Sequence, residues 1–181
     1  MKKILVLCCI TLFAIQTVQA EERGERQSKG ARGGMDIPPV NNDLYSKECG
    51  SCHFAYQPGL LPSASWKKIM GSLDNHFGDN ASLAPQDTDS ILKYVTDNSA
   101  ENANTPRAAK IASSVSGAAP GRITEIPYIV RKHRELSPRT FKENKEVKSF
   151  SNCKACHTRA AEGFYSEDQV KIPGNSNWEN D

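Results

Sequence analysis

Apolar residues recur along this chain at intervals of three and four positions, which is the spacing of helices with one buried face. The clearest stripe is formed by Ile91, Leu92 and Val95 and predicts a helix from about residue 85 to 99. A second helix is expected from about residue 65 to 73, where preceding serines can cap it. No stretch of useful length alternates apolar and polar residues as a strand does. The pattern predicts a mainly α fold.

Two shorter helices are expected on either side of these. One leads from about Val40 to residue 49. In the second half of the chain, Ile126, Ile129 and His133 share one helical face, and Pro127 fits the first turn of that helix. His133 is therefore expected at the end of an apolar stripe.

Residues 101–121 are rich in Ala, Ser, Gly, Asn and Pro and have little hydrophobic pattern. This composition predicts a linker or a loop, and the alternative is a short helix at residues 107–115. A basic helix is expected to follow Pro138 and to run into residue 153. We therefore expect one domain at residues 37–104 and a second at residues 105–181.

The first twenty residues have the three-part layout of a secretory signal peptide. Lys2 and Lys3 precede an apolar run of about 12 residues, and small residues stand before a cleavage site after Ala20. The run is too short to span a bilayer of about 30 Å, although an uncleaved membrane anchor is the alternative. The layout predicts export to the periplasm. Residues 21–36 follow, charged and rich in Gly, and are expected to form a flexible arm.

The four cysteines beyond the signal peptide form two C-x-x-C pairs, each followed directly by a histidine: Cys49-Gly-Ser-Cys52-His53 and Cys153-Lys-Ala-Cys156-His157. C-x-x-C-H is the attachment motif of c-type haem. The two thiols bond to the vinyl groups of one porphyrin, and the adjacent histidine ligates the iron. The motifs predict two covalently attached haems c. Since only 7% of the 181 residues are aromatic, such groups would also supply much of a thin core.

Three other uses of these cysteines fit the motifs less well. A zinc site would place the pairs about 15–20 residues apart, whereas here they are about a hundred residues apart. A thioredoxin-like redox pair would lie in an alternating strand and helix pattern. Disulfides form outside the cytoplasm, but they would leave both trailing histidines unexplained.

Two haem irons have four axial positions, and the chain holds four histidines. His53 and His157 belong to the motifs, so His76 and His133 are the candidate distal ligands. If all four ligate, both irons are six-coordinate, which suits electron transfer rather than substrate binding. The simplest pairing joins His53 with His76 and His157 with His133, and a crossed pairing stays open.

Methionine is the rival of histidine as distal ligand, because a thioether is another common axial ligand of haem. Met70 lies on the expected helix over residues 65–73, where methionine is more often a core residue. Met35 lies in the Gly-rich arm and is a weaker rival. Phe77, next to His76, is suited to pack on a porphyrin edge.

Charge is unevenly distributed along the chain. Residues 21–104 carry a net charge of −4, residues 105–160 one of +8, and residues 161–181 one of −4. The basic segment suggests steering toward an acidic partner. Its alternative roles are to screen haem propionates or to solvate helix faces. Nucleic acid is not expected as a partner of an exported chain without a basic nucleic-acid-binding motif.

The chain resembles the dihaem cytochrome c family of bacteria over about residues 44–173. The resemblance rests on both C-x-x-C-H motifs and on the segments Asp74-Asn-His76-Phe-Gly-Asp-Asn-Ala-Ser-Leu83 and Ile126-Pro-Tyr-Ile-Val-Arg-Lys-His133-Arg-Glu-Leu136. It implies a class I cytochrome c-like N-terminal haem domain and a small irregular α C-terminal haem domain. It also implies bis-histidine ligation and low potentials, with a membrane b-type cytochrome as donor and a monohaem oxygen-binding cytochrome as acceptor.

Together these features predict a monomeric periplasmic electron carrier rather than an enzyme. Two alternatives stay open. One is a small dihaem reductase, peroxidase or gas-binding protein, which needs an iron with a vacant site. The other is an electron-entry subunit of a larger terminal reductase, docked through the basic segment.

Overall fold

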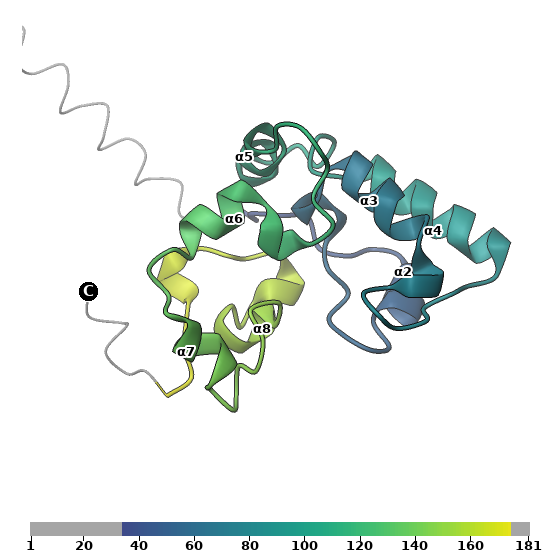
Figure 1. Ribbon diagram of the computed structural model, residues 1–181. Coiled ribbons are helices and arrows are strands. Elements are labelled where there is room, and N and C mark those ends of the chain that lie inside the picture. The colour runs from purple at the N-terminus through teal and green to yellow at the C-terminus, as the bar shows by residue number, and fades with distance from the viewer. Residues whose placement is uncertain (1–33, 175–181) are drawn as a thin grey trace, which may run out of the picture. The chain divides into compact units, whose positions relative to one another are not determined.

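The computed structural model describes residues 34–174 (Figure 1). The predicted signal peptide over 1–20, the predicted arm up to residue 33 and the tail from residue 175 lie outside the described residues. From Met35 onward the described chain belongs to one compact unit. The division into haem domains at residues 37–104 and 105–181 stays a prediction.

The regular elements of residues 34–174 are all helical, which confirms the predicted mainly α class. No helix in this part of the chain is long and apolar enough to cross a membrane. The α-helices are α2 (Asp43–Cys49), α3 (Ser63–Met70), α4 (Pro85–Asp97), α5 (Pro106–Ser114), α6 (Pro127–Lys132), α7 (Pro138–Lys142) and α8 (Cys153–Cys156). Short 3-10 turns lie between and after them, at Pro58–Leu60, Leu73–Asn75, Ile123–Glu125, Ala160–Glu162 and Glu167–Gln169.

Local sequence explains where these helices begin. α4, α5 and α6 each start with a proline, whose fixed φ suits a first turn and whose missing N–H is not needed there. The side chain of Asn42 caps α2 by accepting a hydrogen bond from the N–H of Tyr45 at 2.8 Å. Thr105 caps α5 by accepting one from the N–H of Ala108 at 3.3 Å. The predicted short helix leading to residue 49 is therefore confirmed.

Two helix predictions in the middle of the chain need adjustment. α3 ends at Met70 rather than at residue 73, because Gly71 follows it and the backbone then tightens into the 3-10 turn before His76. Residues 101–121 are not simply a linker, since they contain α5. The alternative of a short helix at residues 107–115 is the one that the structure shows.

The expected basic helix running into residue 153 is wrong, because α7 ends at Lys142. The side-chain oxygen of Asn144 accepts hydrogen bonds from the N–H groups of Glu146 and Val147, at 2.9 and 3.4 Å. Such side-chain bonds offer the backbone an alternative to the helix. Lys148 then has a positive φ of 65°, which turns the chain toward the second motif.

The largest hydrophobic cluster lies where α3 packs against α4 (Figure 1). Trp66, Ile91 and Val95 are buried there, and the indole N–H of Trp66 is satisfied by the carbonyl of Pro58 at 2.8 Å. The cluster continues through Ile111 of α5 to α6. By contrast, the buried apolar residues of the C-terminal segment lie outside it: Val147, Ala160 and Ile172.

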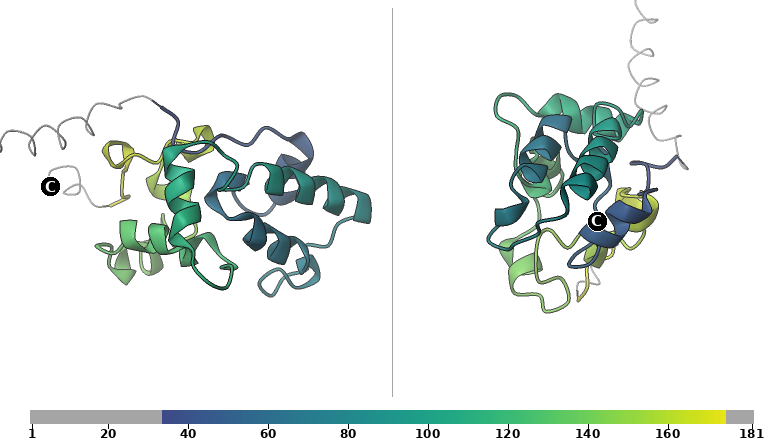
Figure 2. Two further views of the ribbon diagram at one scale, coloured as in Figure 1. Left: turned by 90° about the horizontal axis from the view of Figure 1, so that it is seen from above. Right: turned by 90° about the vertical axis from the view of Figure 1, so that its right-hand side faces the viewer.

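The start of the described chain lies beside its C-terminal segment, as Figure 2 shows. The N–H groups of Asp36 and Ile37 both donate to the carbonyl of Gly163, at 2.9 and 3.1 Å. Gly163 has a φ of 85°, and a Cβ there would lie 1.9 Å from the Ile37 carbonyl oxygen. Only glycine permits this close approach.

Asp36, the last residue of the predicted arm, joins three parts of the chain. Its carboxylate accepts hydrogen bonds from the N–H of Tyr165 at 2.7 Å and the hydroxyl of Ser166 at 3.3 Å. Its Oδ1 lies 2.9 Å from Nε of Arg107, an ion pair whose N–H is not aligned for a hydrogen bond. These contacts join the segment at Tyr165 and Ser166, which follows the second motif, to Arg107 of α5.

Candidate functional site

The first C-x-x-C-H motif lies at the end of α2. Cys49 is the last residue of the helix, and Cys52 and His53 follow in an exposed turn. The Nδ1 atom of His53 lies 2.8 Å from the carbonyl oxygen of Phe54. An Nδ1–H donated to this carbonyl fixes the ring and leaves Nε2 free, as in histidines that bind metals.

The ring of His76 lies opposite that of His53, with ring centroids 6.2 Å apart and ring planes 20° from parallel. A tight turn holds His76 in place, since its N–H donates to the carbonyl of Asp79 at 2.7 Å and the Asp79 N–H donates back at 3.2 Å. Phe77 in this turn has a φ of 58°, which is uncommon for a bulky residue. The turn therefore presents the imidazole of His76 to the first motif.

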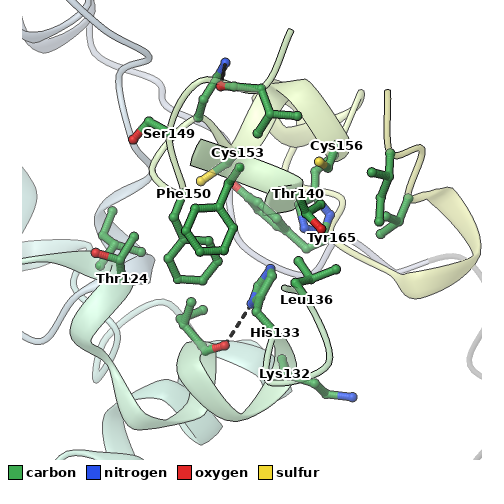
Figure 3. A pocket seen from close by; sticks show the side chains of 18 of the residues that line it. Thr124, Lys132, His133, Leu136, Thr140, Ser149, Phe150, Cys153, Cys156 and Tyr165 are labelled. Atoms are coloured by element: carbon green, nitrogen blue, oxygen red, sulfur yellow. Dashed lines mark hydrogen bonds between the residues drawn. The ribbon is translucent and has the colours of Figure 1, made fainter. Parts of the chain in front are cut away.

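At the second motif, too, a distant histidine lies opposite the motif histidine, with a different angle between the ring planes. Cys153 and Cys156 are the two ends of α8, and His157 follows directly. The ring of His133, the residue after α6, lies opposite His157, with ring centroids 5.9 Å apart and planes at 75°. Nδ1 of His133 lies 2.8 Å from the carbonyl of Ile129, the contact dashed in Figure 3. Nε2 of His133 is again left free.

A cavity surrounds this second pair of histidines (Figure 3). Part of this space is open to solvent. Figure 3 shows the side chains of His133, Phe150 and Cys153 gathered around one space. Apolar groups dominate the rest of its lining, among them Leu60, Ile129, Leu136, Phe141, Val147, Val170 and Ile172.

Both histidine pairs have the separation expected for one metal ion between two imidazoles. A metal–imidazole bond is about 2 Å long and the ring centroid lies roughly 1 Å beyond the nitrogen, so two rings on opposite sides of an ion have centroids about 6 Å apart. In the part of the chain that the structure describes, no three His, Cys, Asp or Glu side chains converge as a protein-only metal site requires. Two opposed imidazoles beside two thiols are instead the donor set for a haem that brings its own four in-plane nitrogens.

Burial sets protonation states that suit these roles. Burial, and then the neighbouring His133 and Arg107, lower the pKa of His157 to about 4, so its ring is neutral at pH 7 and free to ligate. Burial raises the pKa of the Cys49 and Cys153 thiols to about 11. All four cysteines of the described chain are free thiols rather than disulfides, as attachment to vinyl groups requires.

The methionine rivals lie elsewhere. Met70 is part of the hydrophobic cluster, where it is 6% exposed, and Met35 is 42% exposed. It is the ring of His76 that lies opposite His53. Phe77 is about half exposed, and the guanidinium carbon of Arg122 lies 3.8 Å from its ring centroid.

Two tyrosines beside the motif histidines were missed by the sequence analysis. The ring centroid of Tyr56 is 5.2 Å from that of His53, and the centroid of Tyr165 is 5.3 Å from that of His157. The available signal was a tyrosine three positions after the first motif and another eight positions after the second. That signal is weak, because the position of a residue in the sequence does not determine the direction in which its side chain points.

The two motifs lie next to each other. Residues 50–55 of the first and Asn152 and Lys154 of the second line one shallow hollow. The ammonium nitrogen of Lys154 is 5.8 Å from the ring centroid of Phe54. Groups attached at the two motifs would therefore be neighbours.

Comparisons with known proteins agree with this geometry. Residues 45–165 match the model of a family described as dihaem cytochrome c. A dihaem cytochrome c structure from Shewanella baltica OS155 is 42% identical, with a TM-score of 0.63, over 76% of this chain and 97% of that one. One from Rhodobacter sphaeroides is 40% identical, with a TM-score of 0.62, over 71% of this chain and 99% of that one. A search of curated proteins gave no match.

Proposed function

The chain belongs to the dihaem cytochrome c family, with two covalently bound c-type haems, and on this premise we propose that it is a periplasmic electron-transfer protein whose irons are each held between two histidines. His53 and His76 ligate the first haem, and His157 and His133 the second. The facing imidazoles at both motifs carry this assignment. Haem iron with two imidazole ligands has no open position, which suits electron transfer.

The chain's own residues orient these ligands and set their strength. The carbonyls of Phe54 and Ile129 accept the Nδ1–H of His53 and His133, which fixes each tautomer and makes Nε2 a stronger donor. Ligation by histidine rather than by methionine favours low potentials, since a thioether ligand raises them. The mostly apolar lining of the second cavity would give its haem surroundings of low polarity.

The family and the resemblance support a carrier rather than an enzyme. Dihaem cytochromes c are generally electron carriers. In this proposal a monomeric protein, exported by its N-terminal signal peptide, receives electrons from a membrane b-type cytochrome. It passes them to a small monohaem cytochrome that binds oxygen.

Visible spectra of the purified mature protein test this function. We expect two haems per chain, low-spin bands in the oxidised and reduced states, and no change on adding carbon monoxide to the reduced protein, because both irons have two protein ligands. High-spin bands, or a carbon monoxide shift in about half of the haem, would contradict the carrier. They would favour a dihaem reductase or a gas-binding protein with one open iron.

The acceptor is proposed to dock at the basic segment near the second haem. Residues 131–148 contain seven Arg or Lys residues and three acids, and all seven basic side chains are exposed. Lys132 lines the cavity of the second site. Positive charge beside an electron exit raises the encounter rate with an acidic partner.

Salt dependence tests this surface with a small anionic oxidant, ferricyanide. Reversing two charges, Lys132→Glu with Lys142→Glu, is expected to slow oxidation of the reduced protein about two- to tenfold at low ionic strength, with little effect at high salt. The control is Lys67→Glu with Lys68→Glu, which reverses two exposed lysines of α3 and changes the net charge by the same amount. Stopped-flow rates that fall equally in both proteins would show that net charge, and not this surface, matters.

A further inference from the structure

Tyr56 links the two haem motifs directly. Its ring packs 5.2 Å from that of His53, centroid to centroid, three residues after the first motif. Its hydroxyl donates to the carbonyl of Ser151 at 2.6 Å, two residues before Cys153. One half-buried side chain therefore touches the ligand of the first site and the backbone that leads into the second.

The next residue makes a second link. Gln57 is fully buried, and both ends of its amide bond to the C-terminal segment. Its Nε2 donates to the carbonyl of Ala160, and its Oε1 accepts a hydrogen bond from the Tyr165 hydroxyl at 2.6 Å. The Tyr165 ring in turn packs 5.3 Å from that of His157, centroid to centroid.

These contacts form an unbroken path between the two motif histidines. It runs from the His53 ring to Tyr56, along one peptide bond to Gln57, through a hydrogen bond to Tyr165 and on to the His157 ring. A buried amide such as Gln57 is costly unless its hydrogen bonds are made. The path is therefore stiff, because moving one motif relative to the other would break bonds that nothing in the interior replaces.

We propose that Tyr56, Gln57 and Tyr165 are a clamp that sets the distance and relative orientation of the two haems, and that they are positioning residues for electron transfer between them. The clamp rests on the proposed function, since it needs a haem at each motif. The transfer moves one electron and no atoms: one iron goes from ferrous to ferric as the other goes from ferric to ferrous. The tyrosines stay protonated and reduced throughout.

Circular dichroism in the Soret band of the full-length holoprotein tests the clamp. Two haems held close together in a fixed orientation give a bisignate signal, whose amplitude depends on their distance and angle. Tyr56→Phe and Tyr165→Phe each remove one hydroxyl and keep the ring. Each is expected to reduce the amplitude about twofold, because the loosened pair of haems would sample a wider range of distances and angles.

Tyr94→Phe is the matched control. The Tyr94 hydroxyl accepts a hydrogen bond from the N–H of Asn41 at 3.0 Å, and its ring packs on Tyr45 within the N-terminal core. This variant also loses one hydroxyl, but it is expected to keep the wild-type Soret signal.

The outcomes separate the clamp from the proposed function. Unchanged Soret signals in Tyr56→Phe and Tyr165→Phe, each with two low-spin haems, would overturn the clamp and leave the electron carrier intact. A reduction of the same size in Tyr94→Phe would also overturn it, because the effect would then be general loosening of the fold. Wild-type protein with fewer than two low-spin haems would overturn the proposed function and the clamp with it.

Discussion

Replacing His133 with alanine should produce a protein in which one of the two haems binds carbon monoxide, whereas the wild-type protein binds none. The His133 ring lies opposite His157 and is the proposed second ligand of that iron. Its removal would leave His157 as the one histidine holding that iron, in a cavity with a mostly apolar lining. About half of the total haem should therefore turn high-spin and respond to carbon monoxide in the visible spectrum of the reduced protein.

Two further variants make this result specific. His76→Ala should open the first iron in the same way, since its ring lies opposite His53. Phe141→Ala changes the lining of the second cavity without touching a proposed ligand, and it should stay insensitive to carbon monoxide. A His133→Ala protein without a carbon monoxide response would show that another group ligates the second iron.

Replacing Cys153 and Cys156 together with serine should remove one covalent haem and destabilise the protein strongly. The C-terminal segment has few buried apolar side chains, and most of its apolar groups face the cavity of the second site. Without the haem these groups face an empty or hydrated space. We expect a loss of at least about 3 kcal/mol of unfolding free energy, or a drop of roughly 10 °C in Tm. Mass spectrometry of the denatured chain and thermal unfolding measure the two effects.

The matched control is the double replacement of Cys49 and Cys52. It should also remove one haem, but with a smaller loss of stability, because α3 and α4 retain their own hydrophobic cluster around Trp66. Equal destabilisation by the two double variants would contradict the view that the second haem replaces a missing core.

Combining the variants also tests the pairing of the histidines. In the protein that lacks Cys153 and Cys156, adding His76→Ala should create a carbon monoxide site, whereas adding His133→Ala should not. The reverse result would establish the crossed pairing.

The covalent part of both sites could be predicted from the sequence because its chemistry is local. C-x-x-C-H places two thiols and an imidazole within five consecutive residues, so the motifs ending at His53 and His157 could be identified without a fold. The helix containing Ile91 and Val95 likewise followed from its apolar periodicity. Periodicity failed after α7, where the side chain of Asn144 competes for the backbone and ends the helix.

The sequence by itself thus determined the number of haems, and it predicts the residues that attach them and the pool of four histidines. Only the tertiary structure decided that His76 faces His53 and that His133 faces His157, because the spacing along the chain permits either pairing. It also brought Tyr56 and Tyr165 between the motifs, through contacts that span about a hundred residues. Haem attachment involves residues that are neighbours in the sequence. The histidine pairings and the tyrosine contacts depend instead on how the apolar faces of several helices pack together. That packing is determined by many residues along the chain, so no short motif contains it.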